Sequence, residues 1–262
     1  MSFRVFVAFL SLTFFTSNLI QAQFGFSHEI GVIAGPTFFQ TDYGQAGDFG
    51  NFIKNNGFGI GIVHYLNFSY RSDCNCYAPY TYFNDHFKLR SEISYYRSGE
   101  LRHYGKWVDP DRTSITADQL RAMRGRTSVT SLGMQLEYFP WSIRDFSATV
   151  GSFAPFVSLG AHYDSYKPEA WSTMGVLGIP ETTPVKYRDA FDLEGGSTWS
   201  VVGSIGTRYK LTVLSDLMLD FRWKYFNSNW VDGLNPDPVR YPENKANEWL
   251  FFVNFGYIYY LD

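Results

Sequence analysis

The chain has 262 residues, of which 22 are Lys or Arg and 25 are Asp or Glu, giving a formal net charge of −3. This near balance gives no electrostatic footprint for nucleic acid, so no nucleic-acid partner is predicted. Aromatic residues make up 19% of the chain, a share that is heavy for a soluble domain and typical of the aromatic girdles of a membrane barrel.

The first 22 residues have the pattern of a secretory signal peptide. Arg4 provides the positive start, residues 5–15 form an apolar run, and Ala22 precedes the predicted cleavage site. A transmembrane anchor is the alternative, but this run is too short to span about 30 Å of hydrocarbon as a helix. We therefore expect residues 1–22 to be removed on export and residues 23–262 to form a single barrel domain in the outer membrane of a Gram-negative cell.

The exported part of the chain alternates apolar and polar residues with a period of two. Leu132, Met134 and Leu136, for example, alternate with Gln135 and Glu137, which predicts a strand with one apolar face. No later apolar run has the length of a membrane-spanning helix, and closed barrels are the other structure that spans lipid. The pattern recurs in eight segments, at residues 28–39, 57–68, 86–97, 128–139, 153–166, 197–211, 216–226 and 247–262.

The connections between these segments largely alternate between long and short. Bacterial barrels have long extracellular loops, short periplasmic turns and an even strand count, so both termini are expected on the periplasmic side. The exception is the connection over residues 69–85, which is long although it falls on the periplasmic side. A soluble β-sandwich is the rival fold, but the Gly-rich and Ser-rich polar faces suit the crowded interior of a narrow barrel. The predicted fold is all-β, an eight-stranded antiparallel outer-membrane barrel.

Both signs of charge lie on the polar faces and should pair across strands, because unpaired charge in a narrow interior is costly. The interior of an eight-stranded barrel is just filled by side chains, which favours a polar plug over a small ligand site. The predicted lumen charges are Glu29, Lys88, Arg90, Glu92, Glu137, Arg208, Lys210, Asp220, Arg222 and Lys224.

The sequence gives little support for an enzyme and none for a cofactor or metal. The five histidines are scattered, and the spacing of His162 and Ser165 differs from that of outer-membrane lipid deacylases. His162 is predicted to fill the lumen, and His103 to lie in an outer loop without the partners of a membrane protease. The sequence contains no Gly-x-Ser-x-Gly motif, no His-Glu-x-x-His motif and no phosphate-binding loop. Asp109-Pro110-Asp111 lacks the spacing of a calcium loop and indicates a turn.

Cys74 and Cys76 are separated by a single residue in an export context that permits disulfides. A Cys-x-Cys disulfide is strained relative to the usual geometry, and two thiolates alone are too few for a structural zinc site. A local staple of the loop and a partner-linked or metal-bound pair both stay open.

Several short phrases of the chain are similar to a known family. They are residues 28–31 with Gly35, residues 82–90, residues 135–140, and residues 219–226 followed by 229–232. Together they resemble the small outer-membrane barrels of Bacteroidota related to PorG, a component of the type IX secretion and gliding machinery. The chain departs from that family in its Cys74–Cys76 segment and in its final four residues. The resemblance implies an accessory role in protein transport, contacting a periplasmic ring of the machinery rather than forming the export pore.

Two functional hypotheses follow from the sequence. One is a docking barrel whose partners are outer-membrane lipid and periplasmic secretion-machinery proteins. The other is a surface barrel that binds a ligand or a lipid, or a lipid-modifying enzyme. For docking, the long periplasmic connection is the candidate surface, because exposed loops carry function and preorganised aromatics lose little entropy on binding. The alternative is that it caps the barrel mouth and belts the interface. Its candidate contact residues are Tyr70, Cys74, Cys76, Tyr77, Tyr80, Tyr82 and Phe83.

Overall fold

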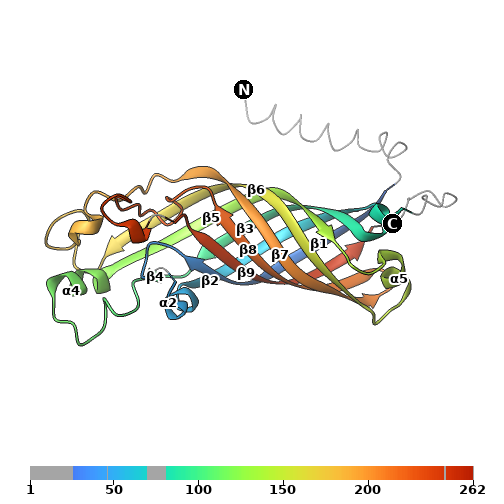
Figure 1. Ribbon diagram of the computed structural model, residues 1–262, viewed down its shortest axis with the longest axis horizontal. Coiled ribbons are helices and arrows are strands. Elements are labelled where there is room, and N and C mark those ends of the chain that lie inside the picture. Colours follow the sequence, from blue (N-terminus) through green and yellow to red (C-terminus); the bar gives the residue numbers. More distant parts are fainter. Residues whose placement is uncertain (1–25, 46, 70–80, 245, 262) are drawn as a thin grey trace, which may run out of the picture.

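The protein forms one closed antiparallel β-sheet in the computed structural model, which describes residues 26–45, 47–69, 81–244 and 246–261 (Figure 1). The predicted signal peptide and the Cys74–Cys76 segment lie outside the described residues. The order across the sheet is β3-β2-β1-β9-β8-β7-β6-β5-β4, and pairing of β3 with β5 closes it. The strands are β1 (Ser27–Gln40), β2 (Asn56–Asn67), β3 (Phe87–Ser98), β4 (Leu101–Arg102), β5 (Met123–Tyr138), β6 (Phe153–Ser172), β7 (Gly196–Thr212), β8 (Ser215–Phe226) and β9 (Trp249–Tyr260).

The barrel has eight full strands, as predicted. β4 has two residues and pairs with β5 just beyond the end of β3, so it prolongs β3 rather than adding a strand. Each full strand pairs with its neighbours in the sequence, and β1 pairs with β9 to close the circle. Because a closed barrel has no free edge, all eight strands satisfy their backbone hydrogen bonds within the sheet, as a structure in lipid must.

The apolar face of each strand points outward. Ile62 lies opposite Ile93, and Ile93 lies opposite Leu132 on the next strand. All three side chains are more than half exposed, at 52%, 52% and 63%. Exposed apolar residues in such contiguous rows are unfavourable in water and favourable against lipid tails. The orientation predicted from the alternation is therefore confirmed.

Short helices lie in the connections rather than in the sheet. They are α2 (Phe49–Lys54), α3 (Tyr82–His86), α4 (Ile115–Ala122) and α5 (Ile143–Ala148), with single 3₁₀ turns η2 (Val185–Tyr187) and η3 (Pro242–Asn244). Side chains cap the helices: Asp48 starts α2, Thr81 starts α3 and Ser114 starts α4 by accepting hydrogen bonds from the first turn. Within the described ranges, none of these helices has the length and apolarity to cross a membrane.

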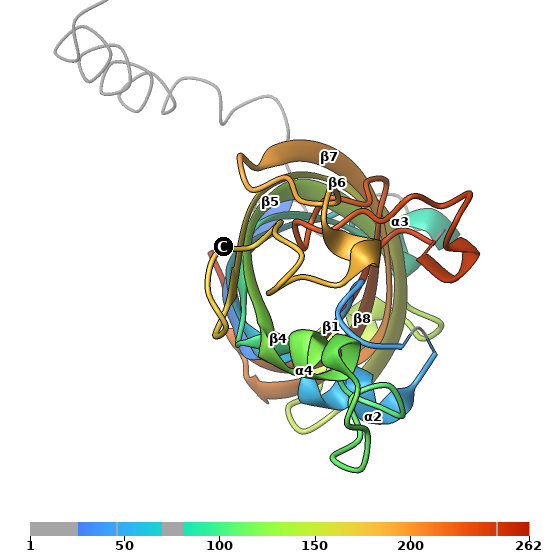
Figure 2. The same ribbon diagram turned by 90° about the vertical axis from the view of Figure 1, so that its left-hand side faces the viewer.

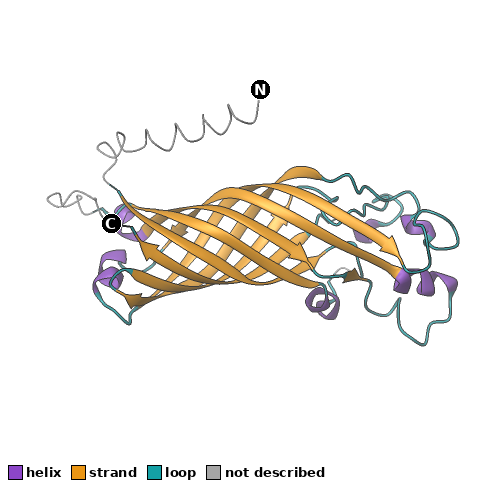
Figure 3. Cartoon of the chain, turned by 180° about the vertical axis from the view of Figure 1, so that it is seen from behind, coloured by secondary structure: helices purple, strands orange, loops and turns teal. Residues whose placement is uncertain are grey.

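The two ends of the barrel differ. Helices α3 and α5, the end of β9 and the start of β1 lie at one end, with the two-residue turn between β7 and β8 (Figure 1). The long connections 41–55, 103–122, 173–195 and 227–248 gather at the other end, which faces the viewer in Figure 2. Figure 3 shows the same separation from behind, with the four long connections at one end of the barrel. By the rule for bacterial barrels, the end with the termini is periplasmic and the other end is extracellular.

The small residues on the inward face make room for large ones. Gly133 on β5 lies opposite His162 on β6. A Cβ atom at Gly133 would lie 2.2 Å from the His162 ring, which real side chains do not tolerate. His162 fills the lumen, with its Nε2 atom 3.2 Å from the side-chain nitrogen of Gln135.

Candidate functional site

The lumen holds all ten charges that the sequence placed there. Each of these side chains is at most 2% exposed, and each has a partner of opposite charge among the described residues. They come from five strands: Glu29 on β1, Lys88, Arg90 and Glu92 on β3, Glu137 on β5, Arg208 and Lys210 on β7, and Asp220, Arg222 and Lys224 on β8.

Arg208 is the centre of the periplasmic half of this network. Its guanidinium lies 2.6 Å from Glu29 and 3.2 Å from Glu137, and Glu29 also accepts a hydrogen bond from Lys88. The guanidinium carbon lies 4.0 Å from the centre of the Tyr65 ring. A guanidinium that is stacked on an aromatic face keeps its edge donors for carboxylates. Arg208 thus joins β7 to β1, β2 and β5 across the lumen.

Arg90 and Arg222 continue the network toward the extracellular end. Arg90 lies 2.7 Å from Glu92, 3.4 Å from Glu137 and 3.2 Å from Asp220. Arg222 lies 2.6 Å from Glu92 and 2.9 Å from Asp220. The two arginines therefore share both acids, and the pairs form one connected network from the periplasmic half to the middle of the barrel.

Two lumen acids were missed by the sequence analysis. Asp164 on β6 pairs with Lys224, and Asp216 on β8 lies 3.3 Å from Lys210 and 3.7 Å from Arg208. Asp164 is two residues from His162, and Asp216 is four residues from Asp220. Both are therefore on faces that the alternation predicts to point inward, so the sequence pattern was sufficient to identify them. With these acids, the described lumen holds six cations and six anions of the strands. The interior is therefore neutral overall.

A lumen of this kind acts as a plug. Ions buried in a low-dielectric interior are stable only when their charges are paired and hydrogen-bonded. Aromatic rings fill space between the pairs: the Tyr65, Tyr96 and Phe252 side chains are fully buried. The arrangement has the chemistry of a structural filling, in which every charge already has its counter-charge.

At the periplasmic end, Tyr82 and Phe83 are the two candidate contact residues that the structure describes; Tyr70, Cys74, Cys76, Tyr77 and Tyr80 lie outside it. The Tyr82 hydroxyl lies 2.6 Å from that of Tyr138. Phe83 stacks on Phe87 at 4.8 Å. Tyr138 and Phe87 belong to the outward faces of β5 and β3, so both candidates pack on the aromatic belt of the barrel. Tyr82 is 59% exposed and Phe83 is 46% exposed.

The periplasmic connections are braced against each other. The Asp85 carboxylate accepts a hydrogen bond from the backbone N–H of Arg144 at 3.2 Å, which joins α3 to α5. Arg144 also donates to the carbonyl oxygen of Ser69 at 3.4 Å. Exposed apolar side chains lie on the same end, with Trp141 and Val150 beside α5 and Val213 and Leu214 at the tip of the β7–β8 turn.

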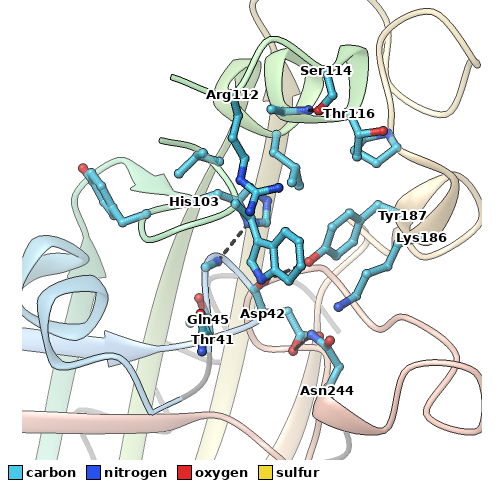
Figure 4. A pocket seen from close by; sticks show the side chains of 17 residues that line it. Thr41, Asp42, Gln45, His103, Arg112, Ser114, Thr116, Lys186, Tyr187 and Asn244 are labelled. Carbon is cyan, nitrogen blue, oxygen red and sulfur yellow. Dashed lines mark hydrogen bonds between the residues drawn. The ribbon is translucent and has the colours of Figure 1, made fainter. Parts of the chain in front are cut away.

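At the extracellular end, the four long connections enclose a cavity of about 590 Å³ (Figure 4). The sequence analysis did not find it, because its residues come from four separate loops with no shared period. Its wall includes three aromatic rings, two cations, one carboxylate and several neutral polar groups. The lining includes Thr41, Asp42, Gln45, His103, Tyr104, Trp107, Arg112, Ser114, Thr116, Lys186, Tyr187 and Asn244.

Hydrogen bonds between the loops hold the cavity open. The Tyr187 hydroxyl donates to the carbonyl oxygen of Asp42 at 3.2 Å, and Asn244 donates to the Asp42 carboxylate at 2.6 Å. Gln119 of α4 donates to the carbonyl oxygen of Pro180 at 2.7 Å. Arg121, also in α4, donates to the carbonyl oxygen of Arg112 at 2.8 Å. All four connections are therefore linked.

Three acids are buried beside the cavity. The Asp232 carboxylate accepts the backbone N–H of Asp42 at 2.7 Å and that of Leu234 at 2.8 Å. Glu248 is buried near Asp232 and Asp42. Burial raises the pKa of Asp232 to about 7 against the lowering effect of its N–H donors. Burial, with the nearby charges of Asp232 and Asp42, raises the pKa of Glu248 well above its ordinary value. These carboxyls therefore hold protons more tightly than exposed acids do.

No protein-family model matches the chain, and no curated protein matches it. Neisserial surface protein A is similar in structure, with 11% identity and a TM-score of 0.47 over 88% of this chain and 96% of that one. A major outer membrane protein from Thermus thermophilus has 12% identity and a TM-score of 0.45, over 90% and 99%. Ail, the attachment invasion locus protein of Yersinia pestis, has 10% identity and a TM-score of 0.44, over 90% and 99%. At such values the likenesses carry no information on function. The closed sheet and its apolar outer face identify the chain as an eight-stranded barrel of the outer-membrane type.

Proposed function

We propose that this protein is a docking component of the type IX secretion apparatus, which binds a periplasmic partner ring and does not itself form the export pore. The observation that carries the proposal is the lumen, where paired charges occupy the space that a pore would need. A barrel with a filled interior acts through its two ends. The sequence resemblance to PorG-like barrels supports the choice of machinery, and the periplasmic end is the one that reaches a periplasmic ring.

Two features support the periplasmic end as the contact surface. The α3 and α5 connections are joined by the Asp85–Arg144 contact, so little conformational freedom of these two connections is lost when a partner binds. Its tips carry apolar side chains, with Val213 72% exposed and Trp141 59% exposed. Turn tips in water are usually polar. Apolar tips on a braced frame suit contact with another protein.

Co-purification from native outer membrane tests the proposal. Val213→Asp places a charge at the periplasmic tip, and Val239→Asp places the same charge in an extracellular loop where the valine is 90% exposed. We expect Val213→Asp to lower the amount of recovered secretion-machinery protein at least fivefold and Val239→Asp to leave it unchanged. Equal recovery with both variants, at equal barrel levels in the membrane, would show that this end is not the docking surface.

Deletion of residues 71–79 tests the long connection separately. Docking through this connection predicts that the shortened barrel still inserts but no longer recovers the machinery or supports export of its cargo. If the deleted barrel inserts, retains its partners and supports export, the contact lies elsewhere on the periplasmic end. Failure of any secretion-machinery protein to co-purify with the intact barrel would contradict the docking function itself.

A further inference from the structure

The extracellular cavity has the construction of a binding site rather than of a gap between loops. Its four walls come from the β1–β2, β4–β5, β6–β7 and β8–β9 connections, which the hydrogen bonds of Asp42, Tyr187, Asn244 and Gln119 hold together. Its volume of about 590 Å³ falls within the range of small-molecule sites. Because it faces the outside of the cell, a ligand reaches it without passing the lumen.

Arg112 gives the cavity a cation that is ready to bind an oxyanion. Its guanidinium carbon lies 4.9 Å from the centre of the Trp107 ring. Among the described residues, no carboxylate lies within 4.0 Å of its nitrogens, in contrast to the six cations of the lumen. Stacking uses the face of the guanidinium and leaves its edge for a bidentate contact with a carboxylate. Arg121 fixes the backbone of this loop by donating to the carbonyl oxygens of Asp109 and Arg112.

His103 adds a neutral hydrogen-bond donor to the wall. Its Nδ1 atom accepts the backbone N–H of Gly44 at 2.9 Å, so in the neutral ring the proton is on Nε2. Burial, with Lys186 and Arg124 nearby, lowers the pKa of His103 to about 3, which keeps the ring neutral. The side chain is 7% exposed, and Nε2 has no hydrogen-bond partner in the described part of the chain. A buried donor without an acceptor is costly, and a ligand oxygen at this wall would satisfy it.

The rest of the lining matches a sugar ring. Tyr104, Trp107 and Tyr187 contribute aromatic rings to the lining. Thr41, Gln45, Ser114, Thr116 and Asn244 add hydroxyl and amide groups to the same cavity (Figure 4). Aromatic faces pack on the C–H faces of a sugar, and neutral hydroxyls and amides pair with its hydroxyls. Lys186 lines the same cavity, so the cations there outnumber the one carboxylate, Asp42.

We propose that the extracellular cavity binds a carboxylated sugar of about disaccharide size, with Arg112 holding the carboxylate. The inference is independent of the docking function, which concerns the opposite end of the barrel. The His103 Nε2–H donates to a ring or hydroxyl oxygen, and the aromatic side chains contact the sugar faces. The site binds its ligand reversibly.

A matched pair of sugars tests the proposal with the purified full-length barrel in detergent micelles. Cellobiouronate and cellobiose differ only in that a carboxylate replaces one hydroxymethyl group, and calorimetry gives the affinity of each. We expect cellobiouronate to bind at least tenfold more tightly, with a difference that shrinks as salt rises. Equal affinities, or no binding of either sugar, would overturn the proposal. Tighter binding of an acidic tripeptide than of cellobiouronate would overturn the claim that the ligand is a sugar.

Two arginine variants locate the site. Arg112→Gln keeps hydrogen-bonding capacity but loses the charge, and it should remove the preference for cellobiouronate. The matched control is Arg126→Gln, because Arg126 also lies over a tryptophan, Trp171 at 5.7 Å, but outside the cavity. A shift in electrophoretic mobility between unheated and boiled samples confirms that both variants are folded barrels. An equal loss of preference in both variants, or none in Arg112→Gln, would show that Arg112 does not bind the carboxylate.

Discussion

At the scale of single residues, the lumen pairs determine what a substitution costs. Lys224 and Asp164 form a pair of their own near the extracellular end, where Asp164 also accepts hydrogen bonds from Ser131 and Ser200. We expect Lys224→Met to destabilise the barrel by about 3–5 kcal/mol, because it leaves a buried carboxylate without a counter-charge. The double variant Asp164→Leu/Lys224→Met should cost less than the sum of the two single variants. Urea unfolding of the barrel in lipid vesicles measures each value.

An exposed ion pair provides the control for this comparison of single and double variants. Arg126 lies 3.9 Å from Glu169, with side chains 36% and 55% exposed. Water screens such a pair, so Arg126→Met should change the unfolding free energy by less than about 1 kcal/mol. Additive costs of the two lumen substitutions, or a cost of Lys224→Met as small as that of Arg126→Met, would mean that the lumen charges are not coupled.

At the scale of elements, the extracellular loops should respond to pH through their buried acids. In the folded loops the pKa of Asp232 is about 7, above that of an unfolded aspartate near 4. The folded state therefore holds the proton more tightly, so its stabilisation is present below about pH 4 and is lost as the pH rises to about 7. We expect residues 227–244 to exchange amide hydrogens more slowly at pH 5 than at pH 8, after correction for intrinsic rates.

Asp232→Asn should flatten this dependence, because an amide does not titrate. Asp111→Asn, in an exposed turn of another loop, should leave it unchanged. A pH dependence of the same size in the wild type and in Asp232→Asn would assign the effect to other groups.

Also at this scale, the sequence predicted the strands far better than the loops. Alternation depends on local contrast between the two faces, so it located all eight strands and ten lumen charges. It placed the start of β5 near residue 128 and the end of β6 near 166, whereas they pair from Met123 to Ser172. Arg124, Arg126 and Glu169 make the outward face of this extension polar, as suits a sheet that continues beyond the lipid. The cavity has no local pattern, since its wall depends on contacts such as Asn244 with Asp42, which are 202 residues apart.

At the scale of the whole molecule, the neutral, filled lumen should not conduct ions. An eight-stranded barrel has an interior just wide enough for its side chains. Here those side chains are also locked in pairs, with Arg90, Arg208 and Arg222 fully buried. In planar-bilayer recordings of the purified barrel, we expect no steady open state under conditions where a sixteen-stranded porin conducts. A reproducible single-channel conductance of the monomer would refute the sealed lumen.

The lumen network also links charge compensation to the order of assembly. Glu29 on the first strand pairs with Arg208, which lies 179 residues later in the sequence. Arg90 pairs with Asp220, which lies 130 residues later. Glu29 and Arg90 also have nearer partners in Lys88 and Glu92, but their long-range partners are absent from a partly built sheet, so an open sheet entering the membrane would carry charges that are only partly compensated. Closure of β1 on β9 brings these long-range partners together. These long-range ion pairs stabilise the closed barrel over an open sheet, so insertion and closure should proceed as a single cooperative event.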